Sequence, residues 1–155
     1  MPTIVVNASR NKSQSAGLQL TVVRRWGDQM LHKLALPASE LSVVLCDDAY
    51  IHRLNLAHRG KDKPTDVLSF PQSEFRAAER PRRGQSLALL GDVVISLTTA
   101  ARQAEARRRS LPSEVRFLLA HGVLHLVGHD HMTPDDKRIM TNRTRQLVRA
   151  ATLDE

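Results

Sequence analysis

Short apolar runs rich in β-branched residues alternate along the chain with longer segments of helical periodicity. Runs of this kind, bounded by polar or turn-forming residues, are typical of buried β-strands. The segments that fit are 3–6, 41–46, 67–70 and 89–96. Because parallel strands need crossover connections and helices lie between these runs, we expect at least some neighbouring strands to be parallel.

Helical segments follow from the spacing of apolar residues and from capping residues at their starts. Asp47 or Asp48 caps one helix, Ser96 caps another, and Thr133 precedes Pro134, which suits the first position of a helix. The expected helices are 18–36, 48–58, 97–109, 113–127 and 133–151. The sequence therefore predicts a single α+β (α/β-like) domain over residues 1–155, with four strands and about five helices.

The segment 72–86 shows no clean period and contains several arginines, a proline and a glycine, which is typical of an exposed loop. Its arginines form either a patch that steers an anionic partner or a charged loop that keeps the protein soluble. They are Arg76, Arg80, Arg82 and Arg83.

The net charge of the chain says more about its function than its length does. The 155 residues include 23 Lys and Arg against 16 Asp and Glu, which leaves a net charge of +7. This excess favours an anionic partner, and nucleic acid over peptide. Aromatic residues make up only 3%, so phosphate contacts rather than stacking of many bases must supply most of the affinity.

Two further observations concern the compartment. No stretch reaches the roughly 18 apolar residues of a membrane span, and the first residues lack the pattern of a signal peptide. We therefore expect a cytoplasmic protein. Cys46, the only cysteine, ends an apolar run and is expected to be a small buried hydrophobe rather than a nucleophile.

Residues 121–131 read H-G-V-L-H-L-V-G-H-D-H and hold four of the seven histidines. In a helix, His121 and His125 project from one face about 5.4 Å apart, which suits two ligands of one ion. His129 would lie about 12 Å from His121 if the helix continued, too far for a bond of about 2.0–2.1 Å to the same zinc. Gly128 is placed to end the helix and turn the chain back, which makes His131 the natural third ligand.

The spacing of these histidines and the glycine matches H-E-x-x-H-x-x-G-x-x-H, the ligand pattern of the long zincins. Gly122 stands where those proteases have a glutamate that acts as general base. The sequence thus predicts one Zn²⁺ at a helix C-terminal turn, without the peptidase base; the alternative is a structural histidine cluster. His129 faces substrate or solvent, and Asp130 is expected to orient an imidazole.

Three segments in order resemble the YbeY family, bacterial endoribonucleases that mature ribosomal RNA. They are the histidine run, L-N-L-A-H-R-G-K-D-K-P-T-D-V-L-S-F-P at 54–71, and G-D-V-V-I-S at 91–96. The resemblance covers about residues 41–132. It departs at His129, where the family commonly has tyrosine before the Asp-His pair.

The resemblance implies a mixed four-stranded sheet packed with helices and zinc held by His121, His125 and His131. It also implies that Arg59 is the basic residue of the active-site cleft, and that the protein acts on single-stranded RNA and associates with the small ribosomal subunit and its proteins. The implied reaction includes maturation of the 16S rRNA 3′ end. We expect Arg59 and His121 to be catalytic.

The chemistry of a three-histidine zinc site agrees with that expectation and leaves the nucleophile open. Zinc held by three neutral histidines activates either a water or, by polarising a phosphoryl oxygen, attack by the RNA 2′-hydroxyl. The planar fork of Arg59 suits the scissile phosphate, Lys61 and Lys63 extend the positive surface, and His129 is a further substrate contact. The rival functions are a zincin-like metallopeptidase and a ribosome-assembly factor with a structural zinc.

Overall fold

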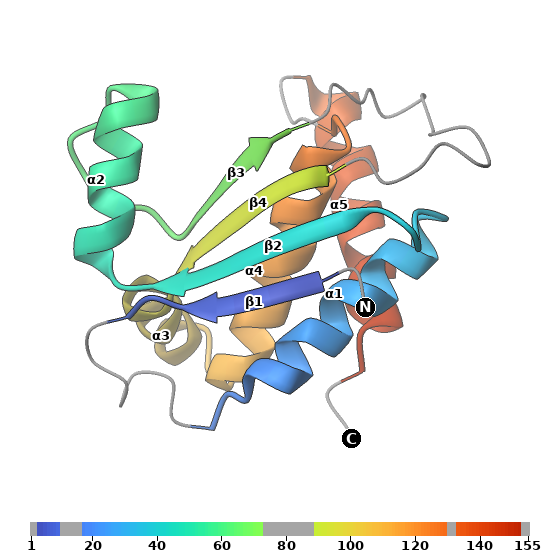
Figure 1. Cartoon of the computed structure of the whole chain (residues 1–155), viewed down its shortest axis with the longest axis horizontal. Coiled ribbons are helices and arrows are strands. Elements are labelled where there is room, and N and C mark those ends of the chain that lie inside the picture. Colours follow the sequence, from blue (N-terminus) through green and yellow to red (C-terminus); the bar gives the residue numbers. More distant parts are fainter. Residues whose placement is uncertain (1–2, 10–16, 73–88, 130–132, 153–155) are drawn as a thin grey trace.

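A four-stranded mixed sheet forms the centre of the protein (Figure 1). The computed structural model describes residues 3–9, 17–72, 89–129 and 133–152. The strands are β1 (Thr3–Asn7), β2 (Glu40–Cys46), β3 (Val67–Pro71) and β4 (Leu89–Ser96), in the spatial order β1-β2-β4-β3. β1, β2 and β4 run parallel, and β3 pairs antiparallel with β4 at one edge, which confirms the mixed sheet.

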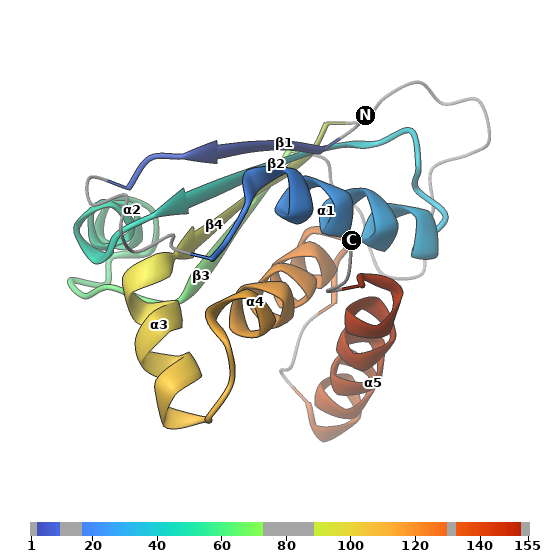
Figure 2. The ribbon, with the colours of Figure 1, turned by 90° about the horizontal axis from the view of Figure 1, so that it is seen from below.

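The described residues include five helices packed around the sheet, as the sequence predicts. They are α1 (Leu20–Lys33), α2 (Asp48–Arg59), α3 (Leu97–Ala106), α4 (Leu111–Leu126) and α5 (Pro134–Ala150). Figure 2 shows α1, α4 and α5 together below one face of the sheet, with α3 at one end. α4 packs against β3, β4, α3 and α5, so it is the central helix of this layer.

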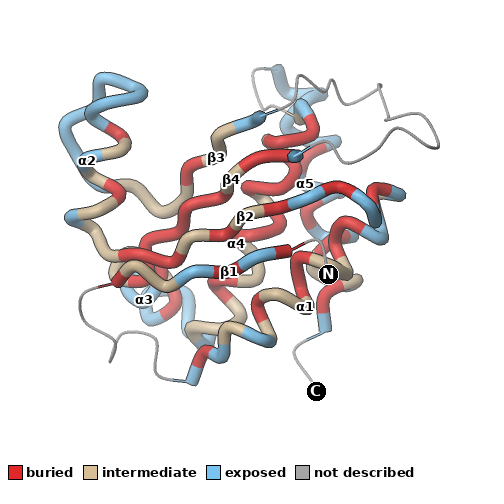
Figure 3. The backbone as a smooth tube through the Cα atoms, in the orientation of Figure 1, coloured by how far each residue is buried: buried red, intermediate tan, exposed pale blue. Residues whose placement is uncertain are grey.

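The two faces of the sheet carry two separate apolar clusters. Alternate residues such as Val43, Val93 and Ile95 face α1 and α4 and belong to the main core. The opposite face holds a smaller cluster under α2 that comprises Cys46, Ile51, Leu68 and Val94. In Figure 3 the buried residues concentrate along β2, β4 and α4.

Cys46 is fully buried, as expected, and its Sγ donates to the carbonyl of Ile95 at 3.5 Å. Burial, with a smaller contribution from the neighbouring carboxylates of Asp47 and Asp48, raises the pKa of the Cys46 thiol to about 12. The thiol is therefore protonated and unreactive at neutral pH.

Capping explains where most helices begin. The side chains of Asp47, Ser96 and Thr133 accept backbone N–H bonds at the starts of α2, α3 and α5. Two boundaries differ from expectation. α3 ends at Ala106 rather than 109, because Arg108 adopts a φ of 55°, and α4 begins earlier than 113 because Ser110 is its cap.

Helix α1 is also shorter than the expected 18–36. It ends at Lys33, and Ala35 has a φ of 61°, which is incompatible with a continuing helix. Within the described ranges no helix is both long and apolar enough to cross a membrane. Arg76, Arg80, Arg82 and Arg83 of the expected basic loop lie outside the described residues.

Candidate metal centre and its surroundings

Two imidazoles converge near the C-terminal end of α4. The Nε2 atoms of His121 and His125 lie 3.2 Å apart, and their ring centroids are 4.8 Å apart. Both side chains are partly buried. The expectation that these two histidines share one face of a helix is therefore confirmed.

The separation of these nitrogens fits two ligands of one zinc ion. With bonds of about 2.0–2.1 Å and tetrahedral angles, two zinc-bound nitrogens lie about 3.3–3.4 Å apart. His131, the expected third ligand, and Asp130 lie outside the described residues. In the part of the chain that the structure describes, no group of three His, Cys, Asp or Glu side chains gathers at a possible metal site.

A Schellman turn ends α4 directly after the histidine pair. Gly128 has a φ of 93°, and its N–H donates to the carbonyl of His125 at 3.1 Å. The N–H of His129 donates to the carbonyl of Leu124 at 3.0 Å. These are the two bonds that define the motif, and the left-handed position favours glycine. The expected role of Gly128 as the end of the helix is confirmed.

Gly122 lets α4 approach the sheet closely. A Cβ placed on it would lie 2.6 Å from Cγ1 of Val93 and 3.2 Å from both Oγ of Ser69 and Cγ2 of Val67. The hydroxyl of Ser69 donates to the carbonyl of Gly122 at 2.8 Å. The position at which zincins have their glutamate thus faces β3 and β4, where a carboxylate side chain has no room.

An ordered charged cluster borders His121 on the N-terminal side. The ring of Phe117 lies 6.3 Å from that of His121 at an interplanar angle of 25°. The guanidinium groups of Arg107 and Arg109 lie 6.0 Å and 5.7 Å from the centre of the Phe117 ring. Glu114 is fully buried and pairs with both arginines, at 3.0 Å and 3.8 Å. Sequence reasoning missed this cluster.

The basic segment predicted to meet the substrate lies at the end of α2. Arg59 is the last residue of the helix, and Gly60 follows with a φ of 68°. The buried amide of Asn55 donates to the carbonyl of Lys63 at 2.9 Å, which fixes the turn. Arg59, Lys61 and Lys63 are all exposed.

The basic segment and the histidine pair lie on opposite faces of the sheet. The two regions flank the same edge strand, because the His58 ring meets Phe70 edge-on at 5.1 Å while Ser69 holds Gly122 from the other face. A single strand, β3, separates them.

His129 is partly buried beyond the Schellman turn. Burial, reinforced by the charge of Arg143, lowers the pKa of its imidazole, so this histidine is neutral at physiological pH.

Asp66 lies directly before β3 and has a structural role. Its carboxylate accepts from its neighbour Val67 N–H at 2.7 Å and from the Gln103 amide at 3.2 Å.

Comparison with solved structures supports the fold. A protein of Thermotoga maritima with a solution structure superposes with a TM-score of 0.63, covering 96% of this chain and 88% of that one. At 19% identity the likeness concerns the fold alone.

Curated relatives named Endoribonuclease YbeY are closer in sequence. That of Desulforamulus reducens is 48% identical over 112 residues, 72% of each chain. That of Syntrophomonas wolfei is 32% identical over 155 residues, 99% of each chain. The Myxococcus xanthus relative is 49% identical over 123 residues, which span 79% of this chain and 40% of that protein. The family described as endoribonuclease YbeY matches residues 6–152, and the chain belongs to this family.

Proposed function

We propose that this protein is a zinc-dependent endoribonuclease that cuts single-stranded RNA in ribosomal RNA processing, including maturation of the 16S rRNA 3′ end. Membership of the endoribonuclease family supports cleavage of RNA. The observation that carries the metal part of the proposal is the 3.2 Å separation of the two Nε2 atoms on α4.

In this proposal His121, His125 and His131 hold one zinc ion, and Asp130 orients one of the imidazoles. Zinc, when bound, supplies Lewis acidity toward the phosphodiester. The ring orientation of His121 is supported by Phe117, and the Ser69 hydrogen bond to Gly122 fixes the height of the helix on the sheet.

Arg59 is proposed to bind the scissile phosphate. Its planar guanidinium suits two parallel bonds to phosphate oxygens and offsets the charge that builds up in the transition state. Lys61 and Lys63, exposed on the same turn, extend the positive surface, and His129 offers a neutral imidazole as a further substrate contact. Arg59 reaches the substrate from the opposite side of β3 to the histidines.

The packing of Gly122 disfavours the rival metallopeptidase. A zincin needs a carboxylate general base beside its first histidine, and here that position is pressed against Val93. A peptidase would have to recruit its base from elsewhere.

The test combines metal analysis with cleavage of an unstructured RNA oligonucleotide. We expect one zinc per chain in the wild type, loss of zinc and cleavage in His121→Ala, and loss of cleavage with retained zinc and fold in Arg59→Ala. Arg53→Ala is the matched control, because Arg53 is an exposed residue of the same helix whose guanidinium lies 5.8 Å from the centre of the Tyr50 ring. It should cleave like the wild type.

Other outcomes would reject the proposal. Cutting of casein by a metal-loaded protein that leaves RNA whole would identify a peptidase. Unfolding of His121→Ala together with unchanged cleavage in Arg59→Ala would identify a structural zinc, as in an assembly factor. The proposed association with the small ribosomal subunit in the cytoplasm is tested by co-sedimentation with purified subunits.

A further inference from the structure

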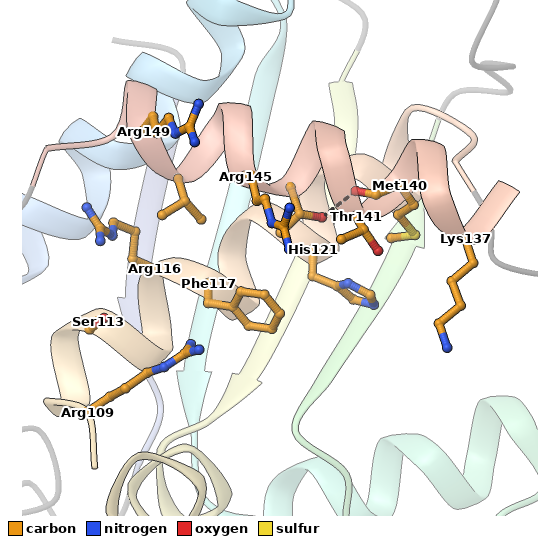
Figure 4. A pocket seen from close by; sticks show the side chains of 12 residues that line it. Arg109, Ser113, Arg116, Phe117, His121, Lys137, Met140, Thr141, Arg145 and Arg149 are labelled. Carbon is orange, nitrogen blue, oxygen red and sulfur yellow. Dashed lines mark hydrogen bonds between the residues drawn. The ribbon is translucent and has the colours of Figure 1, made fainter. Parts of the chain in front are cut away.

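A groove of about 660 Å³ runs between α4 and α5 and has His121 in its wall. Each helix contributes a row of residues spaced four apart, and such residues lie on one face. The α4 side presents Ser113, Phe117 and His121, with Arg109 just before the start of the helix, and the α5 side presents Lys137, Thr141, Arg145 and Arg149. Figure 4 shows Phe117 and His121 of α4 opposite Thr141 and Arg145 of α5.

The charge of this groove is strongly positive. Its lining includes Arg109, Arg116, Lys137, Arg145 and Arg149, and no acidic residue is among the described residues that line it. Lys137, Arg145 and Arg149 are exposed. Within the described ranges none of these three has a carboxylate in ion-pair distance. Exposed cations without acidic partners are a site for an extended anion.

One aromatic ring lies inside this positive groove. Phe117 is partly exposed, and Figure 4 shows its ring between Arg109 and His121. Buried Glu114 pairs with Arg107 and Arg109, whose guanidinium groups lie beside the Phe117 ring. These contacts hold the Phe117 ring in place in the free protein. A fixed ring beside cations matches the way proteins bind single strands, in which bases stack on aromatics and cations follow the phosphates.

We propose that the α4–α5 groove carries the single-stranded RNA to the histidine pair and that Phe117 stacks on one of its bases. This inference rests on the proposed function, because it names the path of that substrate. From Ser113 to His121 the helix rises about 12 Å, which accommodates a few nucleotides. A base-paired strand cannot offer a base face to Phe117, so the groove selects unpaired RNA.

The cationic row is tested by fluorescence anisotropy of a labelled, unstructured oligouridine. Arg145→Ala and Arg149→Ala should each weaken RNA binding about three- to tenfold. Each should also make the negative slope of log K against log salt shallower by about 0.7. Arg138→Ala is the matched control, an arginine of the same helix that lies outside the groove and faces Asp135 at 3.8 Å. It should bind RNA as the wild type does.

The stacking role is tested by Phe117→Leu and Phe117→Tyr. Loss of the ring should weaken oligouridine binding between about fivefold and about 150-fold, and tyrosine should restore it. Zinc content and the thermal unfolding midpoint are measured on both variants. A leucine variant that loses RNA affinity while keeping zinc and fold supports stacking.

Failure of the groove proposal is distinct from failure of the proposed function. Wild-type binding and cleavage by all groove variants would overturn the groove while leaving the nuclease intact. Absence of RNA cleavage by the wild type would reject the function instead. Displacement of oligouridine by polyglutamate as readily as by unlabelled RNA would assign the groove to acidic proteins and also overturn it.

Discussion

Gly122 sets the distance between α4 and the sheet, so its replacement tests the packing that holds the histidine pair. Alanine favours a helix by about 1 kcal/mol over glycine. Its Cβ, however, would lie 2.6 Å from Cγ1 of the buried, stiff Val93. We therefore expect Gly122→Ala to lower the free energy of unfolding by about 1–3 kcal/mol, measured by urea denaturation.

The control for this prediction removes the obstructing atom. In a Val93→Ala background, the Gly122→Ala substitution should cost less than in the wild type, because Cγ1 is gone. Equal costs in the two backgrounds would show that the contact with Val93 does not set the helix position.

Cys46 gives a second prediction for a single residue. Because the thiol is fully buried and its pKa is raised to about 12, a disulfide reagent at pH 8 should not modify the native protein. The same reagent should label the urea-unfolded protein at once, as followed by absorbance. Stoichiometric labelling within seconds without denaturant would contradict the buried position.

Single-residue features could be predicted when they depend on local spacing. The shared face of His121 and His125 and the turn at Gly128 follow from the helical repeat and from glycine's conformational freedom. Phe117 was missed although it lies four residues before His121, the same interval that identified the pair. Its place in the groove depends on how α5 packs against α4, which no local pattern indicates.

Elements are joined by Asp48, which connects the starts of α2 and α3. Its carboxylate accepts from the hydroxyls of Ser96 and Thr99, both at 2.6 Å, and from Arg102 at 2.9 Å. Burial opposes ionisation, but these bonds and the charge of Arg102 outweigh it and hold the Asp48 pKa below its ordinary value of 3.8. The ionised carboxylate therefore stabilises the folded state.

The direction of the shift fixes the pH dependence. A lowered folded-state pKa contributes stability that is complete above the ordinary, unfolded pKa of 3.8 and is lost as pH falls through the folded value. We expect Asp48→Asn to cost about 1–3 kcal/mol at pH 7, and the difference from the wild type to shrink below about pH 4. Urea midpoints across pH 2.5–7 (roughly one point per half unit) measure it.

Asp135→Asn serves as the control for this titration. Asp135 is exposed, and its ion pair with Arg138 is long, at 3.8 Å. Because exposed ion pairs contribute little to stability, its substitution should change the free energy of unfolding little at any pH. An unfolding free energy that differs between Asp48→Asn and the wild type by the same amount at pH 7 and at about pH 2.5, more than one unit below the ordinary carboxyl pKa, would contradict the linkage.

Element starts could be predicted better than element ends. Asp47, Ser96 and Thr133 are recognisable caps, and each begins a helix as expected. The ends of α1 and α3 depend on Ala35 and Arg108 in left-handed conformations, which non-glycine residues adopt only when tertiary packing requires it.

At the scale of the whole molecule, Trp26 reports on the main core. It is the only tryptophan, is fully buried, and its indole N–H donates to the carbonyl of Thr152 at 2.8 Å. We expect a blue-shifted emission that iodide does not quench, and loss of that emission at the same urea concentration as loss of far-UV circular dichroism. A separate, earlier fluorescence transition would show that the C-terminal segment detaches before the core unfolds.

Fold class and element order followed from alternation of apolar runs and helical segments, but spatial order did not. Nothing local indicates that β4 inserts between β2 and β3, because that order depends on pairings such as Val43 with Val93. The groove between α4 and α5 could not be predicted from the sequence either. Its residues spaced four apart can be recognised only once the two helices are known to be neighbours.

The direction of α4 has a consequence for how charge is distributed along the groove. Aligned peptide dipoles give a helix about half an elementary positive charge at its N-terminus and the same negative charge at its C-terminus. α4 ends just after His125 and begins at Leu111, beside Arg109. A cation bound by the histidines would lie at the negative pole, and a phosphate near Arg109 would lie at the positive pole, each favoured by about 0.3–1 kcal/mol. One helix attracts opposite charges at its two ends.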